Sequence, residues 1–563
     1  MAAEALPSRE DRWEYIPPEF RIRDDERFLS IPDAVRVAAA RHPGREAIIE
    51  GDLRLTFARL EEVMIDAVRA AMALGVRPGD RVAVWAPNSA RWILAALAVQ
   101  GAGGILVPLN TRFKGEEAAY ILRKSGATAL FTVTGFLGSD YPGMARRAAP
   151  DLAALAPGRV VVLSGEAATG DLSWEEFMAA GAPVGEDRAR AAVDAVAGET
   201  VSDIMFTSGT TGRPKGVVLT HGQSLRAHGW LARVMDFRAG DRYLIIPPFF
   251  HTFGYKAGWM ACIVHGATIL PQTVFSAGTV LETMERERVS ILCGPPTLFQ
   301  DLLASPRLPE ADLSALRVVM ASAAQVPPEL NRRIREVLRP EILHSGYGLT
   351  EATSLVTATR PRQDDFADIT TTVGRAAWEV EVRIVDPEGR DVPRGTAGEL
   401  WCRGYTVMSG YWDEPAATAE AITEDGWLRT GDVAVMDDRG FIRIVDRIKD
   451  VVIVGGFNVY PAEVERILGE HPDVESIAVV GVPDERMGEV TAAFVVPRPS
   501  AALDAEEFRT WAAGLIAGFK APRHVAVVEA LPRNAGMKVL KNELRERARD
   551  LVQRGSGTGQ GSP

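Results

Sequence analysis

Short runs of apolar residues alternate with helical patterns through the first part of the chain. Between Thr56 and Leu74 the apolar residues recur at helical spacing, and Gly75 ends the run. Shorter runs without that spacing predict buried strands, at residues 81–86, 104–108, 129–133 and 159–163. Strands that alternate with helices in this way indicate parallel sheets covered by helices.

The same pattern continues between residues 200 and 375. Further strands are predicted at residues 241–248, 266–271, 289–296 and 316–322, each entering a turn rich in Gly, Pro or Ser. Loops at the ends of such strands are where ligands bind in α/β proteins. From Val380 to Cys402 the segments shorten and turns become frequent, which indicates a small antiparallel barrel or sheet.

Another change of pattern near Asp446 predicts a domain boundary. Residues 449–548 carry strands of their own and a helix near 462–468, enough for a separate domain. We expect an α/β fold: a large N-terminal domain of layered parallel sheets with a small β-barrel-like subdomain, followed by a mobile, small α+β domain. The expected bounds are 1–446 and 447–548, with a disordered low-complexity tail over 549–563.

Composition narrows the classes of function. The 563 residues are 47% hydrophobic, as in an ordinary globular protein, and the net charge of −12 argues against broad nucleic-acid binding. Three scattered cysteines suggest neither disulfides nor a zinc site. We find no signal-peptide pattern and no apolar run of membrane-spanning length, so a cytoplasmic enzyme is expected.

The stretch TSGTTGRPKG, from Thr207 to Gly216, carries the strongest chemical signal. Its glycines let backbone amides approach an anion, its hydroxyls add donors, and Lys215 adds a positive charge. It is not a Walker A loop, because Lys215 is followed by glycine rather than Ser or Thr. An ordinary turn is the alternative, yet an ordered loop behind an apolar strand favours polyphosphate binding. The candidate residues are Thr207, Ser208, Gly209, Thr210, Thr211, Gly212 and Lys215.

Five further segments follow in order along the chain. They are GYGLTE at 346–351, WLRTGD at 427–432, DRIKD at 446–450, GGFNVYPAEVE at 455–465 and PRNAGMKVLK at 532–541. Together with TSGTTGRPKG, they make the chain similar to the adenylate-forming (ANL) superfamily of acyl-CoA synthetases, acyl-adenylating domains and luciferases. The resemblance covers nearly the whole chain, from about residue 30 to about 546.

The resemblance implies a reaction in two steps. A carboxylate attacks the α-phosphorus of ATP to form an acyl-AMP and pyrophosphate, and the thiol of coenzyme A then displaces AMP. ATP and Mg²⁺ are therefore the expected cofactors, and coenzyme A is the expected co-substrate. Negative charge gathers on phosphorus in the first step, so placed cations and donors stabilise its transition state.

Site residues follow from the resemblance. Thr350 would bind phosphate and Glu351 would anchor Mg²⁺, a hard cation that prefers carboxylate, water and phosphate oxygens. Asp432 would accept both ribose hydroxyls, with Arg447 assisting at the ribose or phosphate; an ordinary Gly-Asp turn and a surface ion pair are the alternatives. The adenine would lie against Tyr347 and the loop of Ser322, Ala323 and Ala324.

Catalysis of adenylation is assigned to Lys538 by the same resemblance. Family members usually place Gly directly before this lysine, whereas here Met537 intervenes; Lys541 is the other candidate. Lys449 matches the hinge about which the small domain would rotate after adenylation. Gly455, Gly456 and Phe457 would then meet the pantetheine arm of coenzyme A, although the two glycines could simply form a hairpin turn.

The segment PPFFHTFG, residues 247–254, resembles the acyl-pocket motif of the family. His251 is its site candidate, although an isolated histidine is more often a packed residue. Tyr255 and Lys256 are conceivable donors to ring ketones, with packing as the favoured role. The segment carries no acidic residue to pair with an amino group, so an amino-acid substrate is disfavoured.

The subgroup that the chain resembles comprises bacterial ligases acting on the bicyclic propanoate from steroid ring degradation. A medium- or long-chain fatty acid is the other expected substrate. Two alternative functions stay open: an acyl-AMP ligase that loads a carrier protein, and a nucleotide-binding scaffold without catalysis. We expect only small-molecule partners, with no nucleic acid and no membrane span. Whether the chain forms a homodimer is left open.

Overall fold

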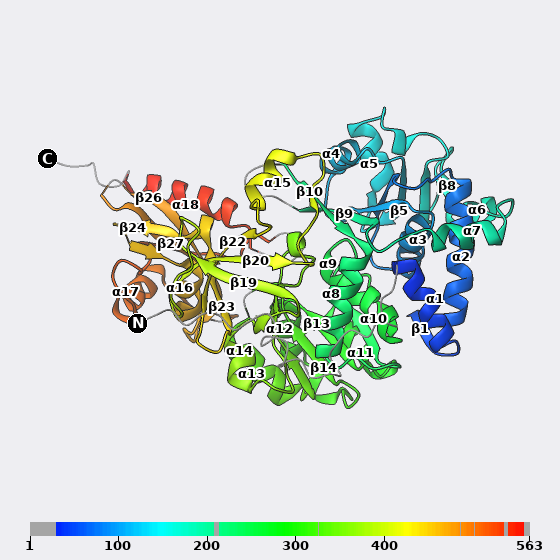
Figure 1. Cartoon of the computed structure of the whole chain (residues 1–563). Helices are drawn as coiled ribbons and strands as arrows, with labels where there is room; N and C mark the ends of the chain where they lie inside the picture. The colour runs from blue at the N-terminus through cyan, green and yellow to red at the C-terminus, as the bar shows by residue number, and fades with distance from the viewer. Residues whose placement is uncertain are drawn as a thin grey trace. The chain divides into compact units, whose positions relative to one another are not determined.

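The computed structural model describes residues 30–556, except 208–212, 325, 456, 485, 500 and 534–538. The chain forms two compact units. Unit 1 comprises the chain up to Thr370 with Ala376–Glu381 and Arg403–Leu428, and unit 2 comprises Thr371–Arg375, Val382–Cys402 and the chain from Arg429 onward. Figure 1 shows the course of the chain through both.

A seven-stranded sheet forms one layer of unit 1, with the strand order β15-β14-β13-β11-β12-β1-β2. All its pairs are parallel except β1 with β2. The strands are β1 Glu46–Glu50, β2 Leu53–Thr56, β11 Arg242–Ile245, β12 Thr268–Pro271, β13 Ile291–Gly294, β14 Val318–Ala321 and β15 Ile342–His344.

A nine-stranded sheet forms a second layer, in the order β21-β10-β9-β4-β3-β5-β7-β8, with β6 beside β5. Its central strands are parallel, whereas β10 pairs antiparallel with both β9 and β21. The strands are β3 Arg81–Trp85, β4 Ile105–Pro108, β5 Ala129–Phe136, β6 Ser139–Asp140, β7 Val160–Ser164, β8 Leu172–Ser173, β9 Val201–Thr207, β10 Lys215–Thr220 and β21 Gly410–Tyr411.

Helix α3, Ala90–Gly101, joins the two sheets. It contacts β1 of the first sheet and β3 and β4 of the second, and all its residues except Arg91 are buried. A helix that is apolar on all sides fits only such a position between two layers. Its neighbour α2, Phe57–Ala73, begins where the Thr56 side chain accepts from the Arg59 amide, as the apolar spacing predicted.

Further helices cover the outer faces of unit 1. Helices α11, α12 and α13 pack on the seven-stranded sheet in one apolar core that includes Leu281, Phe299 and Ile334 (Figure 1). No described helix is long and apolar enough to cross a membrane. The helices are α1 Ile31–Arg41, α4 Gly115–Ser125, α5 Tyr141–Ala148, α6 Trp174–Ala180, α7 Glu186–Asp194, α8 His221–Val234, α9 Thr252–Gly254, α10 Ala261–His265, α11 Ala277–Arg286, α12 Pro296–Ala304, α13 Pro328–Val337, α14 Phe366–Thr371 and α15 Pro415–Ala421. A π-helix, η4, spans Tyr255–Met260.

A four-stranded sheet, β19-β20-β22-β23, follows the expected change of pattern after Val380. Its strands are β19 Val380–Val385, β20 Gly398–Gly404, β22 Leu428–Met436 and β23 Ile442–Arg447.

The last sheet of unit 2 has the order β25-β24-β27-β26, with β28 beside β27. Helices pack on both its faces, since one apolar core includes Val464 and Phe508 and another includes Leu544. The elements are β24 Val452–Val454, β25 Phe457–Val459, α16 Pro461–Leu468, β26 Val474–Asp484, β27 Gly488–Pro497, α17 Ala505–Leu515, β28 His524–Val527 and α18 Lys541–Ser556.

Candidate active site

Four neighbouring parallel strands bring separate candidate segments to one edge of unit 1. Strands β11, β13, β14 and β15 are adjacent in the seven-stranded sheet, and each ends in a loop at the carboxyl edge. The candidate residues that follow these strands are His251 after β11, Ser322 after β14 and Tyr347 after β15. This edge is the usual binding edge of an open parallel sheet.

The predicted adenine residues meet at this edge. The Ser322 amide donates to the Gly294 carbonyl oxygen at 3.0 Å, and the Ser322 hydroxyl donates to the Gly346 carbonyl oxygen at 3.4 Å. Gly346 and Tyr347 form the short strand β16, which pairs with β17, Thr357–Ala358. Ala323 has a left-handed backbone, with φ of 69°. The loop of Ser322, Ala323 and Ala324 therefore lies beside the strand of Tyr347.

The Thr207–Lys215 stretch joins two antiparallel strands. Thr207 ends β9 and pairs with Lys215, the first residue of β10. At the return end of the loop, the Tyr120 hydroxyl donates to the Pro214 carbonyl oxygen at 3.3 Å, and the Arg213 guanidinium lies 5.3 Å from the centre of the Tyr120 ring. The candidates Ser208, Gly209, Thr210, Thr211 and Gly212 lie outside the described residues.

Tyr411 links the two charged candidates of unit 1. Its hydroxyl donates to Glu351 Oε1 at 3.0 Å, and Lys215 Nζ lies 5.0 Å from the centre of its ring. Strand β21 places Tyr411 here by pairing with β10, where Tyr411 lies opposite Val217. Burial, and then the Glu351 carboxylate, raise the pKa of Tyr411 well above its ordinary value, so the hydroxyl keeps its proton.

Sequence reasoning missed Tyr411. It lies about 60 residues after Glu351 in the chain, and the local sequence around it carries no feature that distinguishes it from a packed aromatic residue. Only the pairing of β21 with β10 places it between Lys215 and Glu351.

Glu351 lies on η6, a single 3₁₀ turn over Thr350–Ala352 that also carries Thr350. Its carbonyl oxygen accepts from the Met408 amide at 2.8 Å, so the backbone and the carboxylate are both fixed. No group of three or more His, Cys, Asp or Glu among the described residues could hold a metal by itself. A nucleotide-bound Mg²⁺ takes only one or two protein carboxylates besides phosphate oxygens, and Glu351 fits that requirement.

His251 precedes helix α9, and its Nδ1 accepts from the Phe253 amide at 3.3 Å. Its side chain is exposed, whereas the next residue, Thr252, is fully buried. His251 is therefore a water-accessible group at the carboxyl edge of the sheet.

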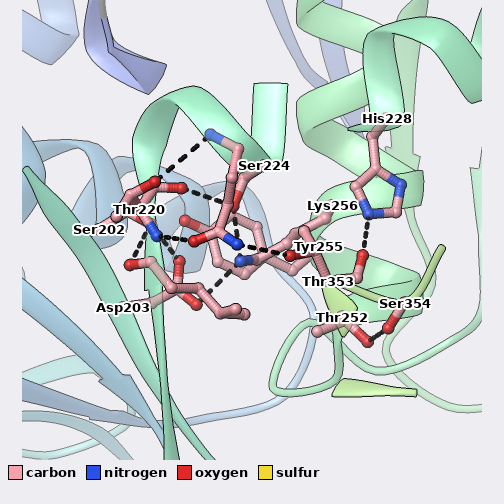
Figure 2. A network of polar contacts seen from close by, with 12 residues as sticks. Ser202, Asp203, Thr220, Ser224, His228, Thr252, Tyr255, Lys256, Thr353 and Ser354 are labelled. Atoms are coloured by element: carbon pink, nitrogen blue, oxygen red, sulfur yellow. Dashed lines mark hydrogen bonds and ion pairs between the residues drawn. The ribbon is translucent and has the colours of Figure 1, made fainter. Parts of the chain in front are cut away.

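The neighbouring Tyr255 and Lys256 are bonded within the core (Figure 2). Lys256 Nζ lies 3.0 Å from Asp203 Oδ1 and donates to Ser224 Oγ at 2.7 Å, and both members of the ion pair are 0% exposed. The Tyr255 hydroxyl accepts from Gln100 Nε2 at 2.6 Å, and its ring stacks on Trp259. The favoured packing role fits these contacts of both residues.

Unit 2 carries the predicted ribose pair. Asp432 lies in β22 opposite Arg447 in β23, and Arg447 Nε is 3.0 Å from Asp432 Oδ1. Asp432 is only 3% exposed, which distinguishes it from the carboxylate of an ordinary surface turn.

The predicted hinge and pantetheine segments follow in unit 2. Lys449 is an exposed residue of a short 3₁₀ turn, Ile448–Asp450. Gly455, with φ of 58°, occupies the turn between β24 and β25, and Phe457 is 60% exposed beside Phe519. Gly455 therefore has the local geometry of the hairpin-turn alternative. Contact of this turn with the pantetheine arm stays a prediction. Gly456 lies outside the described residues.

Lys538 also lies outside the described residues. The other lysine candidate, Lys541, begins helix α18 and pairs with Glu465 at 2.8 Å. Burial opposes its charge, but Glu465 and Asp446 outweigh burial and raise the pKa of Lys541. Because Lys541 is bonded inside its own unit, Lys538 remains our candidate for adenylation.

Comparison with known proteins identifies the family. The model for the AMP-binding enzyme family matches residues 35–412, and the model for the AMP-binding enzyme C-terminal domain matches residues 463–538. The chain belongs to the AMP-binding enzyme family. The expected membership of the adenylate-forming superfamily and the expected α/β fold with a small C-terminal domain are thereby confirmed.

Relatives of this family align along nearly the whole chain. A "3-[(3aS,4S,7aS)-7a-methyl-1,5-dioxo-octahydro-1H-inden-4-yl]propanoyl:CoA ligase" of Mycobacterium tuberculosis is 46% identical, covering 92% of this chain and 98% of that protein. The ligase of the same name from Rhodococcus jostii is 44% identical, covering 92% and 99%. The crystal structure of ATP-bound MatB from Rhodopseudomonas palustris has a TM-score of 0.80 at 28% identity, covering 93% and 99%.

The prediction of enzyme class is confirmed by these matches: the chain is an AMP-forming acyl-CoA synthetase. Its use of ATP and CoA follows from the family and from an ATP-bound structural neighbour.

Proposed function

We propose that this enzyme activates an apolar, non-amino carboxylic acid as an acyl-adenylate, with Lys215 and Glu351 binding the polyphosphate side of ATP. The observation that carries the proposal is the shared contact with Tyr411, which holds a cation and a carboxylate on one side chain. Lys215 would neutralise phosphate oxygens directly. Glu351 would hold the Mg²⁺ that accompanies ATP, and the ion would supply a further positive charge to the phosphates.

In the first step, a carboxylate oxygen of the acid forms a bond to the α-phosphorus while the bond to the bridging oxygen of pyrophosphate breaks. We propose that Lys538 stabilises the charge that accumulates on the α-phosphate, since an ammonium is a compact positive group. The hydroxyls and amides of residues 207–212, with Thr350, would bind the phosphates. In the second step, the CoA sulfur attacks the acyl carbon, AMP departs, and the thiol proton is released.

On the nucleoside side, Asp432 would accept the two ribose hydroxyls. Its pairing with Arg447 orients the carboxylate, and a carboxylate can accept two hydrogen bonds at once. Tyr347 and the Ser322–Ala324 loop would bind adenine. We propose that Lys449 acts as the hinge, and that Gly455, Gly456 and Phe457 contact the pantetheine arm.

For the acid, we propose a fused-ring propanoate of the class in the name of the Mycobacterium and Rhodococcus relatives, both more than 40% identical over nearly their whole length. Segment 247–254 contains no Asp or Glu, which fits an acid without an amino group. His251 is an exposed polar side chain of this segment, and we propose that it lies near the reacting carboxylate. A medium- or long-chain fatty acid remains the competing substrate class.

The experiment is an acid panel with ATP, Mg²⁺ and either CoA or a pantetheinylated carrier protein. The panel contains the indane-dione propanoate, fatty acids of graded length and free amino acids, and the readouts are AMP and the thioester. We expect the highest kcat/KM for the bicyclic acid with CoA as acceptor. A higher kcat/KM for a fatty acid would contradict the proposed substrate. A higher kcat/KM with the carrier protein would contradict CoA as the acceptor.

The absence of AMP with every acid would support the scaffold alternative instead. The cytoplasmic location and the homodimer remain predictions. Cell fractionation and sedimentation of the purified protein would test them.

A further inference from the structure

Two consecutive residues after Glu351 have a left-handed backbone. Thr353 has φ of 52° and Ser354 has φ of 59°, and neither is glycine. Such a backbone is uncommon for any residue with a side chain and is an outlier for a β-branched residue such as Thr353. It persists only where the surrounding structure holds it in place, and such sites are concentrated where function requires a fixed geometry.

Helix α8 holds Thr353 through two side chains. His228 Nε2 lies 2.8 Å from the Thr353 carbonyl oxygen (Figure 2). Gln223 Nε2 donates to Thr353 Oγ1 at 3.1 Å. The Thr353 hydroxyl itself donates to the Thr406 carbonyl oxygen at 2.7 Å, and Thr353 is 0% exposed. The carbonyl, the hydroxyl and the amide, which donates to Thr350, are therefore all bonded.

His228 is a donor here because a carbonyl oxygen can only accept. Burial lowers the pKa of His228 to about 3, so the imidazole is neutral with its proton on Nε2. Its Nδ1 has no hydrogen-bond partner among the described residues, so the contact with Thr353 is the polar interaction of this ring.

Ser354 is held from the other side. Its hydroxyl bonds the Thr252 hydroxyl, next to the acyl-pocket residue His251, and its amide donates to the Leu349 carbonyl oxygen at 2.8 Å. The returning chain packs closely on Gly348, where an added Cβ would lie 2.1 Å from the Ser354 carbonyl carbon. The second glycine of the GYGLTE segment thus has a steric reason: the left-handed pair leaves no room for a side chain at Gly348.

We infer that His228 and Gln223 of helix α8 are positioning residues for metal-bound ATP, because they fix the left-handed turn at Thr353 and Ser354 that orients the Glu351 carboxylate. This inference rests on the proposed role of Glu351. Residues that hold a metal-binding side chain in its orientation typically contribute tenfold or more to metal affinity. The bond between Ser354 and Thr252 also ties this turn to the proposed acyl segment (Figure 2).

The test is calorimetric binding of ATP, in Mg²⁺ and in EDTA, to the full-length protein. His228→Leu removes the donor, and we expect the Kd for ATP in Mg²⁺ to rise about tenfold while the Kd in EDTA changes by less than about twofold. His228→Gln keeps a donor at the position of Nε2 and should restore binding. Gln223→Met is the second variant, with a loss in the same direction expected.

The matched control is His265→Leu. His265 Nε2 bonds the carbonyl oxygen of Gly229, also on α8, so this change removes a similar contact that does not involve Thr353. If the effect of His228→Leu were merely structural, ATP binding by His228→Leu would also weaken in EDTA. ATP binding by His265→Leu would weaken too. Equal Mg²⁺-dependent binding by the wild type, His228→Leu and Gln223→Met would overturn the inference.

The outcomes separate this inference from the proposed function. If His228→Leu weakens Mg²⁺-dependent ATP binding but no acid is activated by the wild type, the positioning role stands and the proposed function is wrong. If the wild type shows no Mg²⁺-dependent ATP binding, both are wrong.

Discussion

At the residue scale, Tyr411 joins two residues of opposite charge through different parts of one side chain. Tyr411→Phe keeps the ring beside Lys215 but removes the bond to Glu351, and we expect the KM for ATP in Mg²⁺ to rise about tenfold, the usual effect of losing a hydrogen bond to a charged group. Tyr411→Leu also loses the ring and should have a larger effect. Initial rates of adenylation measure both.

Tyr141→Phe is the control, because that hydroxyl donates to the Thr111 carbonyl oxygen at 2.8 Å and has no contact with Lys215 or Glu351. An unchanged KM in Tyr411→Phe would show that the bond to Glu351 has no role in binding ATP.

The buried Lys256–Asp203 pair allows a second prediction at this scale. Lys256→Met leaves a carboxylate in the core without its cation, which typically costs about 3–5 kcal/mol of unfolding free energy. Lys256→Met combined with Asp203→Leu removes both charges and should recover much of the loss. Denaturant unfolding of each variant measures these differences.

Lys520→Met provides the comparison, since Lys520 and Glu463 form a partly exposed pair at 2.8 Å. Removal of such a pair costs about 1 kcal/mol or less. If Lys256→Met were as stable as Lys520→Met, the buried pair would be unimportant for stability.

At the scale of elements, the sequence predicts the helices and strands that depend on residues close together in the chain. Apolar runs located β3, β4, β5 and β7 to within three residues at either end, and the helical spacing located α2. The apolar strand expected before the TSGTTGRPKG stretch was also predictable, and it is β9. Tyr411 was not predictable, since its position depends on a strand pairing between residues far apart in the chain.

The turn at Thr353 and Ser354 was equally hidden from sequence reasoning. Thr and Ser carry no preference for a left-handed backbone, so the sequence at these two positions does not indicate the turn. His228 and Gln223 likewise resemble ordinary polar positions of a helix until the fold brings Thr353 against them.

Helix α8 also predicts how stability depends on pH. It carries His221 and His228, and burial lowers the pKa of each to about 3, as it does for His344. The unfolded chain binds protons near pH 6.5 while the folded chain does not, so this contribution is full above about pH 6.5 and is lost as the pH falls toward 3. Each histidine should lower the unfolding free energy by about 2 kcal/mol at pH 5.

Thermal unfolding between pH 7.5 and 5.0 checks this expectation. The Tm should fall with pH, and the fall should be smaller in His344→Gln, which has one titrating group fewer. The same fall in both proteins would assign the pH dependence to other groups.

At the scale of the whole molecule, the two half-reactions should be separable by mutation. Lys538→Ala should lose adenylation by a factor of about 100 or more, yet convert supplied acyl-AMP and CoA to the thioester at close to the wild-type rate. Lys541→Ala should instead reduce stability, because it removes the cation that pairs with Glu465. Quenched-flow assays of each half-reaction distinguish the two lysines.

Loss of adenylation in Lys541→Ala with a normal Lys538→Ala would reverse the assignment. Equal loss of both half-reactions in Lys538→Ala would indicate general damage to the protein.

The most direct test of the account is exchange of labelled pyrophosphate into ATP, which reports reversible adenylate formation. The account predicts exchange by the wild type that requires both the acid and Mg²⁺, does not require CoA, and falls at least about 100-fold in Glu351→Gln. Exchange that proceeds without an acid, or at the wild-type rate in Glu351→Gln, would contradict it.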